Sequence, residues 1–135
     1  MRVILEDVPA DGLCMFHAIG KPLGMHGKTL KKMLQNFLLE NETMLINDVP
    51  IKQWIEWEFG ISTKQYAKNF DSSLWWGGAL DITILSTMLG IPIYVYDHKT
   101  GRLMSDVRPL KRSKILPFIA LCFFGKSHYM HVRFA

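Results

Sequence analysis

Residues 10–19 read ADGLCMFHAI, and this stretch joins a turn to the start of an apolar helix. Asp11 and Gly12 are residues that favour a turn, and the apolar pattern from Cys14 onward is typical of one or two helical turns. A cysteine at the start of a helix lies near free backbone N–H groups and the positive end of the helix dipole, and both favour a thiolate. Cysteine is also a common small buried side chain, so the stretch by itself leaves the role of Cys14 open.

The loop in front of this helix comprises Asp11, Gly12, Leu13 and Cys14. A turn of this kind directs backbone N–H groups at the space beside the sulfur, which is the geometry of an oxyanion hole. Gly12 allows the backbone to approach closely because no side chain stands in the way. A catalytic thiol at position 14 therefore needs only a base, and that base has to come from another part of the chain.

The chain has five histidines that qualify as a base: His17, His26, His98, His128 and His131. His17 lies on the same helix as Cys14 and is poorly placed to reach round the sulfur, while His26 and His98 fall in predicted loops. His128 opens the last predicted strand, and His131 points to the opposite face because strand side chains alternate. Periodicity does not choose between these two.

The composition indicates one compact domain over residues 1–135, with 49% hydrophobic residues and no apolar run of the ~20 residues that a membrane helix needs. The N-terminal MRVILEDVP is too short and too soon acidic for a signal peptide. With two cysteines, Cys14 and Cys122, the chain is not a disulfide framework, and we expect a reducing, cytoplasmic compartment and a monomer.

The net charge of +4 comes with two basic clusters, KTLKK at 28–32 and RPLKRSK at 108–114. These suggest nucleic-acid binding or, as we favour, a solvated helix face and a solvated loop, since no exposed-looking aromatics lie between the charges. No His/Cys spacing is typical of a zinc site, and WWGGAL lacks the lysine and length of a phosphate loop. We therefore expect no metal and no cofactor.

The pattern along the chain predicts helices first and most strands late, which indicates an α+β fold with a small sheet covered by helices. Asp48 is a predicted cap, Leu45 continues the apolar face of the second helix, and Gly90 ends the last helix. The predicted helices are 14–20, 28–45, 50–60, 62–70 and 79–89. The predicted strands are 2–8, 91–97, 115–124 and 128–134, the last two joined by a hairpin through GKS.

Several apolar residues are expected in the core without any further role: Phe16, Ile19, Leu85, Ile93, Val95, Phe118 and Ile119. Trp54 and Trp57 are three residues apart and are expected to pack a helix. At least one of Trp75 and Trp76 is expected in the core. Cys122 lies in an apolar strand and is expected to be an inert buried thiol.

Three stretches together resemble the ovarian-tumour (OTU) family of cysteine proteases. DGLCMFHAI is similar to the family's cysteine box, and WWGGALDITILSTMLGIPIYVYD to its central block of tryptophan-glycine, helix and strand. SHYMHVRF resembles the closing strand, whose first histidine is the catalytic base. The three blocks follow in the family's order from about residue 7 to the C-terminus.

The resemblance implies a papain-like α+β fold with a small, mostly antiparallel sheet flanked by helices. It implies hydrolysis after the C-terminal glycine of ubiquitin or a ubiquitin-like modifier. Cys14 is then the nucleophile and His128, rather than His131, the base. Asp11 is the acid of the cysteine box and shapes the oxyanion loop. Trp76 and Gly77 match the pair beside the substrate channel, where a narrow slot admits only the side-chain-free Gly-Gly tail.

One position departs from the family pattern. Many members carry Asp or Asn two residues after the histidine, to orient the imidazole, and this chain has Met130. Three possibilities stay open for the group that orients the imidazole. It is an acid from before the cysteine, as in some viral members, with Asp7 as the candidate, or it is a backbone carbonyl. Alternatively, no such group exists and the site is a Cys–His dyad.

The short length and His17 resemble the compact viral members of the family, which would act in the host cytoplasm. The alternatives are an inactive, ubiquitin-binding OTU-like module, a protease that processes a viral polyprotein and, more remotely, a basic RNA-binding domain.

Overall fold

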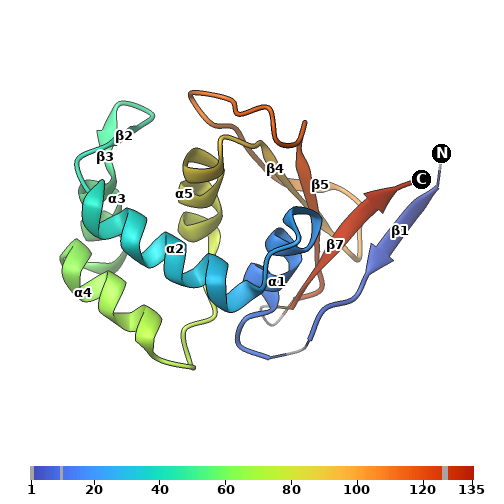
Figure 1. Cartoon of the computed structure of the whole chain (residues 1–135), viewed down its shortest axis with the longest axis horizontal. Helices are drawn as coiled ribbons and strands as arrows, with labels where there is room; N and C mark the ends of the chain where they lie inside the picture. The colour runs from blue at the N-terminus through green and yellow to red at the C-terminus, as the bar shows by residue number, and fades with distance from the viewer. Residues whose placement is uncertain (1, 10, 126–127) are drawn as a thin grey trace.

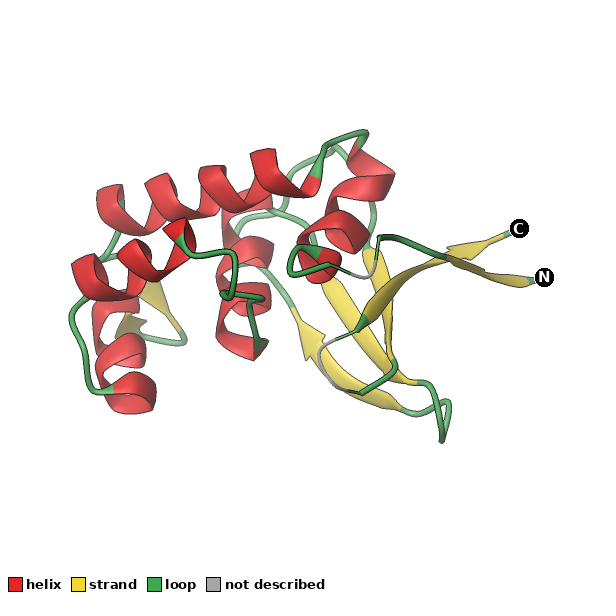
Figure 2. Ribbon diagram, turned by 90° about the horizontal axis from the view of Figure 1, so that it is seen from below, coloured by secondary structure: helices red, strands yellow, loops and turns green. Residues whose placement is uncertain are grey.

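The computed structural model describes residues 2–9, 11–125 and 128–135. Residues 126 and 127, in the predicted GKS turn, and Ala10, in the turn before Cys14, lie outside the described residues. The helices and strands form two parts, with the helices gathered on one side of a sheet (Figures 1 and 2). This arrangement confirms the predicted α+β class.

Five α-helices are described, and most begin and end where the residue types direct. Gly60 and Gly90 end α3 and α5 in the left-handed conformation, with φ of 69° and 70°, and Ser62 caps α4 by accepting from the Gln65 N–H. The α-helices are α1 (Cys14–Gly20), α2 (Gly27–Glu40), α3 (Ile51–Phe59), α4 (Thr63–Lys68) and α5 (Ala79–Leu89). Two 3₁₀ turns, η1 (Lys21–Leu23) and η2 (Asn69–Asp71), follow α1 and α4.

The main sheet has the strand order β1-β7-β6-β4-β5. Its strands are β1 (Val3–Glu6), β4 (Ile93–Asp97), β5 (Leu103–Val107), β6 (Ile119–Phe123) and β7 (Tyr129–Phe134). Only the central β4–β6 pair is parallel; β1–β7, β6–β7 and β4–β5 are antiparallel. The sheet is therefore mostly antiparallel, as predicted.

The core lies between the sheet and the helices. The helix α1 packs on β6 and β7, α5 packs on β4 and β5, and α2 packs against both α1 and α5. One contiguous cluster of buried apolar residues joins these layers, and it includes Phe16, Ile19, Leu85, Ile93, Val95 and Ile119. Among the described residues, none of the helices has the length and apolar character needed to cross a lipid bilayer.

Three sequence predictions about this part of the fold are wrong. The second helix ends at Glu40, and Leu45 belongs to β2 (Leu45–Ile46), which pairs with β3 (Val49–Pro50). Asp48 lies in the turn of this hairpin with φ of 64° and caps no helix. The strand β5 was not predicted, because its exposed and polar residues give no clear alternation.

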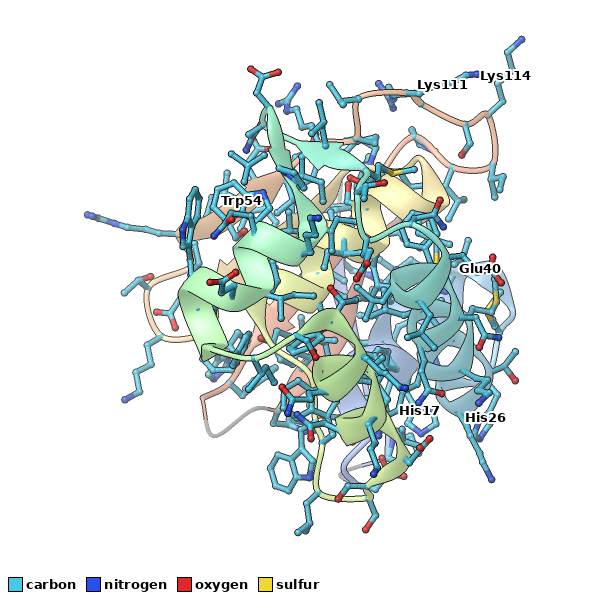
Figure 3. The ribbon with its side chains drawn as sticks, turned by 90° about the vertical axis from the view of Figure 1, so that its left-hand side faces the viewer. His17, His26, Glu40, Trp54, Lys111 and Lys114 are labelled. Atoms are coloured by element: carbon cyan, nitrogen blue, oxygen red, sulfur yellow. The ribbon has the colours of Figure 1, made fainter. Side chains whose placement is uncertain are left out.

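Three predictions about burial also need correction. Phe118 is largely at the surface, and the Trp57 side chain is 64% exposed rather than packed into a helix interface. Trp54 does pack, and its Nε1–H donates to the Ile46 carbonyl at 2.9 Å. Lys31, within the KTLKK cluster, is 7% exposed, so this helix face is not wholly solvated. The RPLKRSK loop is exposed, and Lys111 and Lys114 project from it (Figure 3).

Candidate active site

Cys14 is the first residue of α1, and a tight turn delivers the chain to it. The Asp11 side chain makes the turn, because its Oδ1 accepts from the Leu13 N–H at 2.9 Å, and the Asp11 carbonyl accepts from the Cys14 N–H at 3.2 Å. The Cys14 side chain is buried, with 2% exposed. This loop is therefore formed by hydrogen bonds between neighbouring residues, with the Asp11 carboxylate at its centre.

The loop before Cys14 is packed against the segment that carries Trp76. A Cβ at Gly12 would lie 2.6 Å from the Ser73 carbonyl oxygen and 2.8 Å from Trp76 Nε1, so only glycine fits. Gly77 has φ of 82°, and a Cβ there would lie 2.5 Å from Met15 Cε. The structure thus brings the predicted oxyanion loop and the predicted Trp76–Gly77 pair into direct contact.

Cys14 also meets the C-terminal strand, more than a hundred residues further along the chain. The backbone of Tyr129, the residue after His128, hydrogen-bonds to the Cys14 thiol. Burial raises the pKa of this thiol, and the negative charge of Asp11 raises that pKa further, whereas the Tyr129 hydrogen bond lowers it. Without substrate the thiol is therefore held mainly in its protonated form, and a base is needed to remove the proton.

His128 lies directly before β7, and hydrogen bonds of the hairpin turn fix its backbone. The His128 N–H donates to the Gly125 carbonyl at 3.0 Å, and its carbonyl accepts from the Phe124 N–H at 2.9 Å. The imidazole Nε2 lies 3.7 Å from Asp7 Oδ1, which also accepts from the Val8 N–H. The imidazole therefore has an acidic neighbour on its Nε2 side.

The sheet register explains why Asp7 lies near His128. The last two residue pairs between β1 and β7 are Leu5 with Val132 and Glu6 with His131. One further step along this register places Asp7 opposite Met130, the position where many family members carry the orienting residue. The neighbouring strand thus supplies a carboxylate where the last strand has a thioether.

The remaining histidines have structural partners. His131 Nδ1 lies 2.7 Å from Glu6 Oε1, as a cross-strand contact on the face opposite Met130. His17 accepts from the Gly27 N–H at 3.2 Å and lies 3.5 Å from Asp11 Oδ2. His26, next to His17 in Figure 3, caps α2 by accepting from the Lys28 N–H at 3.1 Å. The His17 ring therefore supports the Asp11 loop from behind.

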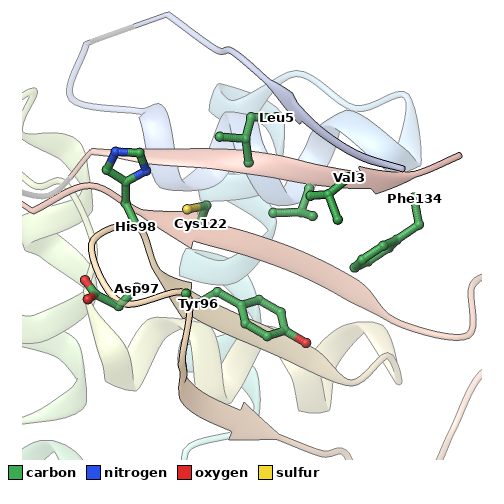
Figure 4. A pocket seen from close by; sticks show the side chains of 9 residues that line it. Val3, Leu5, Tyr96, Asp97, His98, Cys122 and Phe134 are labelled. Atoms are coloured by element: carbon green, nitrogen blue, oxygen red, sulfur yellow. The ribbon is translucent and has the colours of Figure 1, made fainter. Parts of the chain in front are cut away.

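Cys122 lies away from this constellation. It is buried and lines a cavity of ≈ 460 Å³ on the face of the sheet that the helices leave uncovered, together with Val3, Tyr96 and His98 (Figure 4). Burial raises the pKa of the Cys122 thiol as well. Among the residues that the structure describes, no group of three or more His, Cys, Asp or Glu side chains is placed to bind a metal.

Sequence reasoning did not find the contacts that join these pieces. Tyr129 and Ser73 take part through backbone atoms, which leave no mark on residue type. Only the glycine at position 12 signalled a close approach, without indicating its partner.

Comparison with known proteins agrees with this geometry. The family model for the OTU-like cysteine protease matches residues 9–129. The chain is 32% identical over 103 residues to the Schizosaccharomyces pombe protein named "Putative ubiquitin thioesterase otu1", which covers 76% of this chain and 29% of that protein. The chain therefore spans less than a third of the length of this curated relative.

Two solved structures share the fold. An ovarian tumour (OTU) domain in complex with ubiquitin superposes with a TM-score of 0.74 at 24% identity, covering 96% of this chain and 69% of that one. The Hazara virus OTU bound to ubiquitin superposes with a TM-score of 0.70 at 19% identity, covering 97% and 80%. The fold likeness therefore includes a viral domain, while the curated sequence relative is fungal.

The cysteine box, the tryptophan-glycine segment and His128 fall within the matched region, while the strand β7 that follows His128 continues beyond it. The chain belongs to the OTU-like cysteine protease family.

Proposed function

We propose that the chain is a deubiquitinase that hydrolyses the peptide or isopeptide bond after the C-terminal glycine of ubiquitin or a ubiquitin-like modifier. Cys14 is the nucleophile, and His128 is the general base and acid. The observation that carries the proposal is the hydrogen bond between the Cys14 thiol and the backbone of Tyr129, which supports a meeting of the thiol with the residue next to it, His128.

The reaction follows the order of a cysteine protease. His128 takes the Cys14 proton, and the sulfur attacks the carbonyl carbon of the modifier's last glycine. The C–N bond breaks as His128 returns the proton to the leaving lysine amine, which leaves a thioester. Water, activated by His128, then hydrolyses the thioester and frees Cys14. The raised pKa of the thiol makes the proton transfer to His128 an essential part of the first step.

The oxyanion forms in front of the loop from Asp11 to Cys14. The proposed donors are backbone N–H groups of this loop other than that of Leu13, which the Asp11 carboxylate already binds, and loss of one such donor typically costs about 10²–10³ in rate. Because the Asp11 carboxylate holds the Leu13 N–H, Asp11 acts by shaping the loop.

Trp76 is 43% exposed and borders Gly12, and we assign it with Gly77 to the channel for the modifier's tail. A slot between an aromatic ring and glycine backbone sterically favours residues without side chains. We assign Asp7 as the third member of the site, where it stabilises the imidazolium of His128. The same proposal includes a single domain over residues 1–135, action as a monomer and a cytoplasmic location.

A probe made of ubiquitin with a C-terminal electrophile tests the function, because it bonds only to an activated thiol in the channel. We expect the wild type and Cys122→Ala to be labelled and Cys14→Ala to remain unlabelled. His128→Ala should label at most slowly.

The binding-module alternative rests on Met130 and on the raised pKa of Cys14, both of which argue for weak activity. It predicts that the wild type binds ubiquitin without being labelled. That outcome would refute the proposed protease activity and leave ubiquitin as the binding partner. A panel of ubiquitin linkages and ubiquitin-like modifiers, applied to the labelled enzyme, then identifies the preferred substrate.

A further inference from the structure

The segment Ser72–Gly78, here called the tryptophan loop, has no regular secondary structure beyond its first turn, yet it carries Trp76 and Gly77 to the site. A loop of this kind holds a fixed position only if other elements bind its backbone. Two ionisable side chains from the helical part do so, one near each end of the loop, and neither takes part in the proposed chemistry.

Lys31 binds the first part of the loop. It lies in the middle of α2 and is 7% exposed. Its Nζ donates to the Ser72 carbonyl at 3.2 Å and to the Trp75 carbonyl at 2.9 Å. One ammonium group thus binds the first and last carbonyls of the turn Ser72–Trp75, which precedes Trp76.

Asp81 binds the last residue of the loop. It lies in the first turn of α5 and is fully buried. Its Oδ2 accepts from the Gly78 N–H at 3.0 Å, and its Oδ1 accepts from the Tyr66 hydroxyl of α4 at 2.6 Å. The Tyr66 ring is buried as well, so this pair is anchored in the core.

Trp75 supplies the third constraint. Its ring stacks on Phe70 with centroids 5.8 Å apart and meets the Tyr66 ring edge-on at 5.2 Å. With Trp75 held among the helices, the next residue, Trp76, is left at the surface against Gly12. The expectation that one of the two tryptophans is a core residue is therefore met by Trp75.

Burying two ionisable groups is energetically unfavourable, and the structure carries the signs of that cost. Burial lowers the pKa of Lys31 and raises the pKa of Asp81 to about 6. Apolar residues of similar size often stabilise such positions better, so stability alone does not account for the burial of Lys31 and Asp81. What the two groups provide is a set of directed hydrogen bonds to one loop.

We propose that Lys31 and Asp81 are positioning residues, which fix the tryptophan loop so that Trp76 and Gly77 form the channel for the C-terminal tail of the modifier. The proposal rests on the proposed function. It divides the site into two parts. The positions of Cys14 and His128 do not depend on the Lys31 and Asp81 side chains, whereas the shape of the channel does.

The test compares channel use with thiol reactivity in the same variants. Lys31→Met keeps the aliphatic stem and removes the two hydrogen bonds, and Asp81→Leu removes the bond to Gly78. Asp81→Asn is the conservative variant, because its Oδ1 still accepts from the Gly78 N–H while its amide donates to the Tyr66 oxygen. Lys28→Met is the matched control, since Lys28 is an exposed lysine one turn earlier on α2.

Two rates are measured: kcat/KM for a fluorogenic ubiquitin amide, and alkylation of Cys14 by iodoacetamide, which needs no channel. We expect Lys31→Met and Asp81→Leu to lose about 10- to 100-fold in kcat/KM, because small displacements of a bound substrate have effects of this size. Alkylation should stay within about twofold of the wild type, and Asp81→Asn and Lys28→Met should stay near wild type in both assays.

Three results overturn the proposal: unchanged kcat/KM in Lys31→Met and Asp81→Leu, a parallel fall in alkylation, or an equal loss in Asp81→Asn and Asp81→Leu. If Asp81→Leu does not fold, Tyr66→Phe removes only one hydroxyl bound to Asp81, and a smaller loss confined to kcat/KM is expected. A wild type that turns over no ubiquitin substrate refutes the proposed function instead. Hydrogen exchange of the Gly78 amide then decides whether the loop is held as described: exchange should be faster than in the wild type in Lys31→Met and near the wild-type rate in Asp81→Asn.

Discussion

Replacing Asp7 by asparagine tests whether the carboxylate just after β1 stabilises His128, the proposed catalytic histidine. Asparagine keeps the oxygen that accepts from the Val8 N–H at 2.9 Å and removes only the negative charge. We expect kcat/KM for a ubiquitin substrate to fall, because an imidazolium forms at His128 as the thiol loses its proton.

The size of the effect follows from the distance and the exposure. At the 3.7 Å between His128 Nε2 and Asp7 Oδ1, two unit charges attract by about 1 kcal/mol in water and about 4 kcal/mol at an effective dielectric of about 20. The Asp7 side chain is 75% exposed and that of His128 is 27% exposed. Screening therefore favours the lower part of this range, about 1–2 kcal/mol, or about 5- to 30-fold in rate.

The assay is kcat/KM with a fluorogenic ubiquitin amide at low salt and again at about 0.5 M salt, where exposed charge pairs are screened. The difference between wild type and Asp7→Asn should shrink at high salt. Asp48→Asn, in the exposed β2–β3 turn, is the control. Met130→Asp in the Asp7→Asn background should recover part of the loss.

Two outcomes would refute the reasoning. A change of less than about twofold at low salt would mean that the carboxylate does not act on His128. A loss as large as that of His128→Ala would mean that Asp7 does more than stabilise a charge.

Three further predictions concern Gly12, Asp81 and Glu6. Gly12→Ala should lower kcat by about 10²-fold or more, because its Cβ would meet Ser73 and Trp76; Gly24→Ala, with open space around it, should leave turnover intact in the same assay. The pKa of Asp81 is raised to about 6, so the protonated form is favoured in the native protein, and the stability that it contributes is lost as the pH rises through that value. In urea titrations, the free energy of unfolding of the wild type relative to Asp81→Asn should therefore fall between about pH 4 and pH 7, by up to about 3 kcal/mol; a flat difference would contradict this. The hydrogen bond to His131 lowers the pKa of Glu6, so its contribution is present at neutral pH and lost in acid, and Glu6→Gln should lower the melting temperature at about pH 7 more than at about pH 3, as circular dichroism would record.

Local signals in the chain predicted the elements that frame the site. The helices over 14–20 and 79–89 have the predicted bounds, because an apolar run, Gly90 and Pro92 fix them within a few residues. The β2–β3 hairpin was missed for the opposite reason: Leu45 continues the apolar spacing of α2, and the pairing of Leu45 and Ile46 with residues 49–50 appears only in the structure.

The candidate site likewise has a part that local sequence signals predicted and a part that they did not. The Asp11–Cys14 turn is built by hydrogen bonds between neighbouring residues, so the cysteine's position at a helix start could be inferred directly. The choice between His128 and His131 could not, since alternation along a strand allows either face. The family resemblance selected His128, and in the structure Glu6 on β1 is the partner of His131.

Residue types and their spacing thus established a helix that begins with a thiol, a glycine needing close approach, and a late strand with a histidine at its start. How Asp7 comes to lie beside His128, how Gly12 meets Trp76, and why Lys31 and Asp81 are buried emerged only from the packed chain. The physical reason is the separation along the chain of the residues that make each contact. Turns and caps form between residues a few positions apart, whereas these contacts join residues tens to more than a hundred positions apart, which sheet register and helix packing bring together.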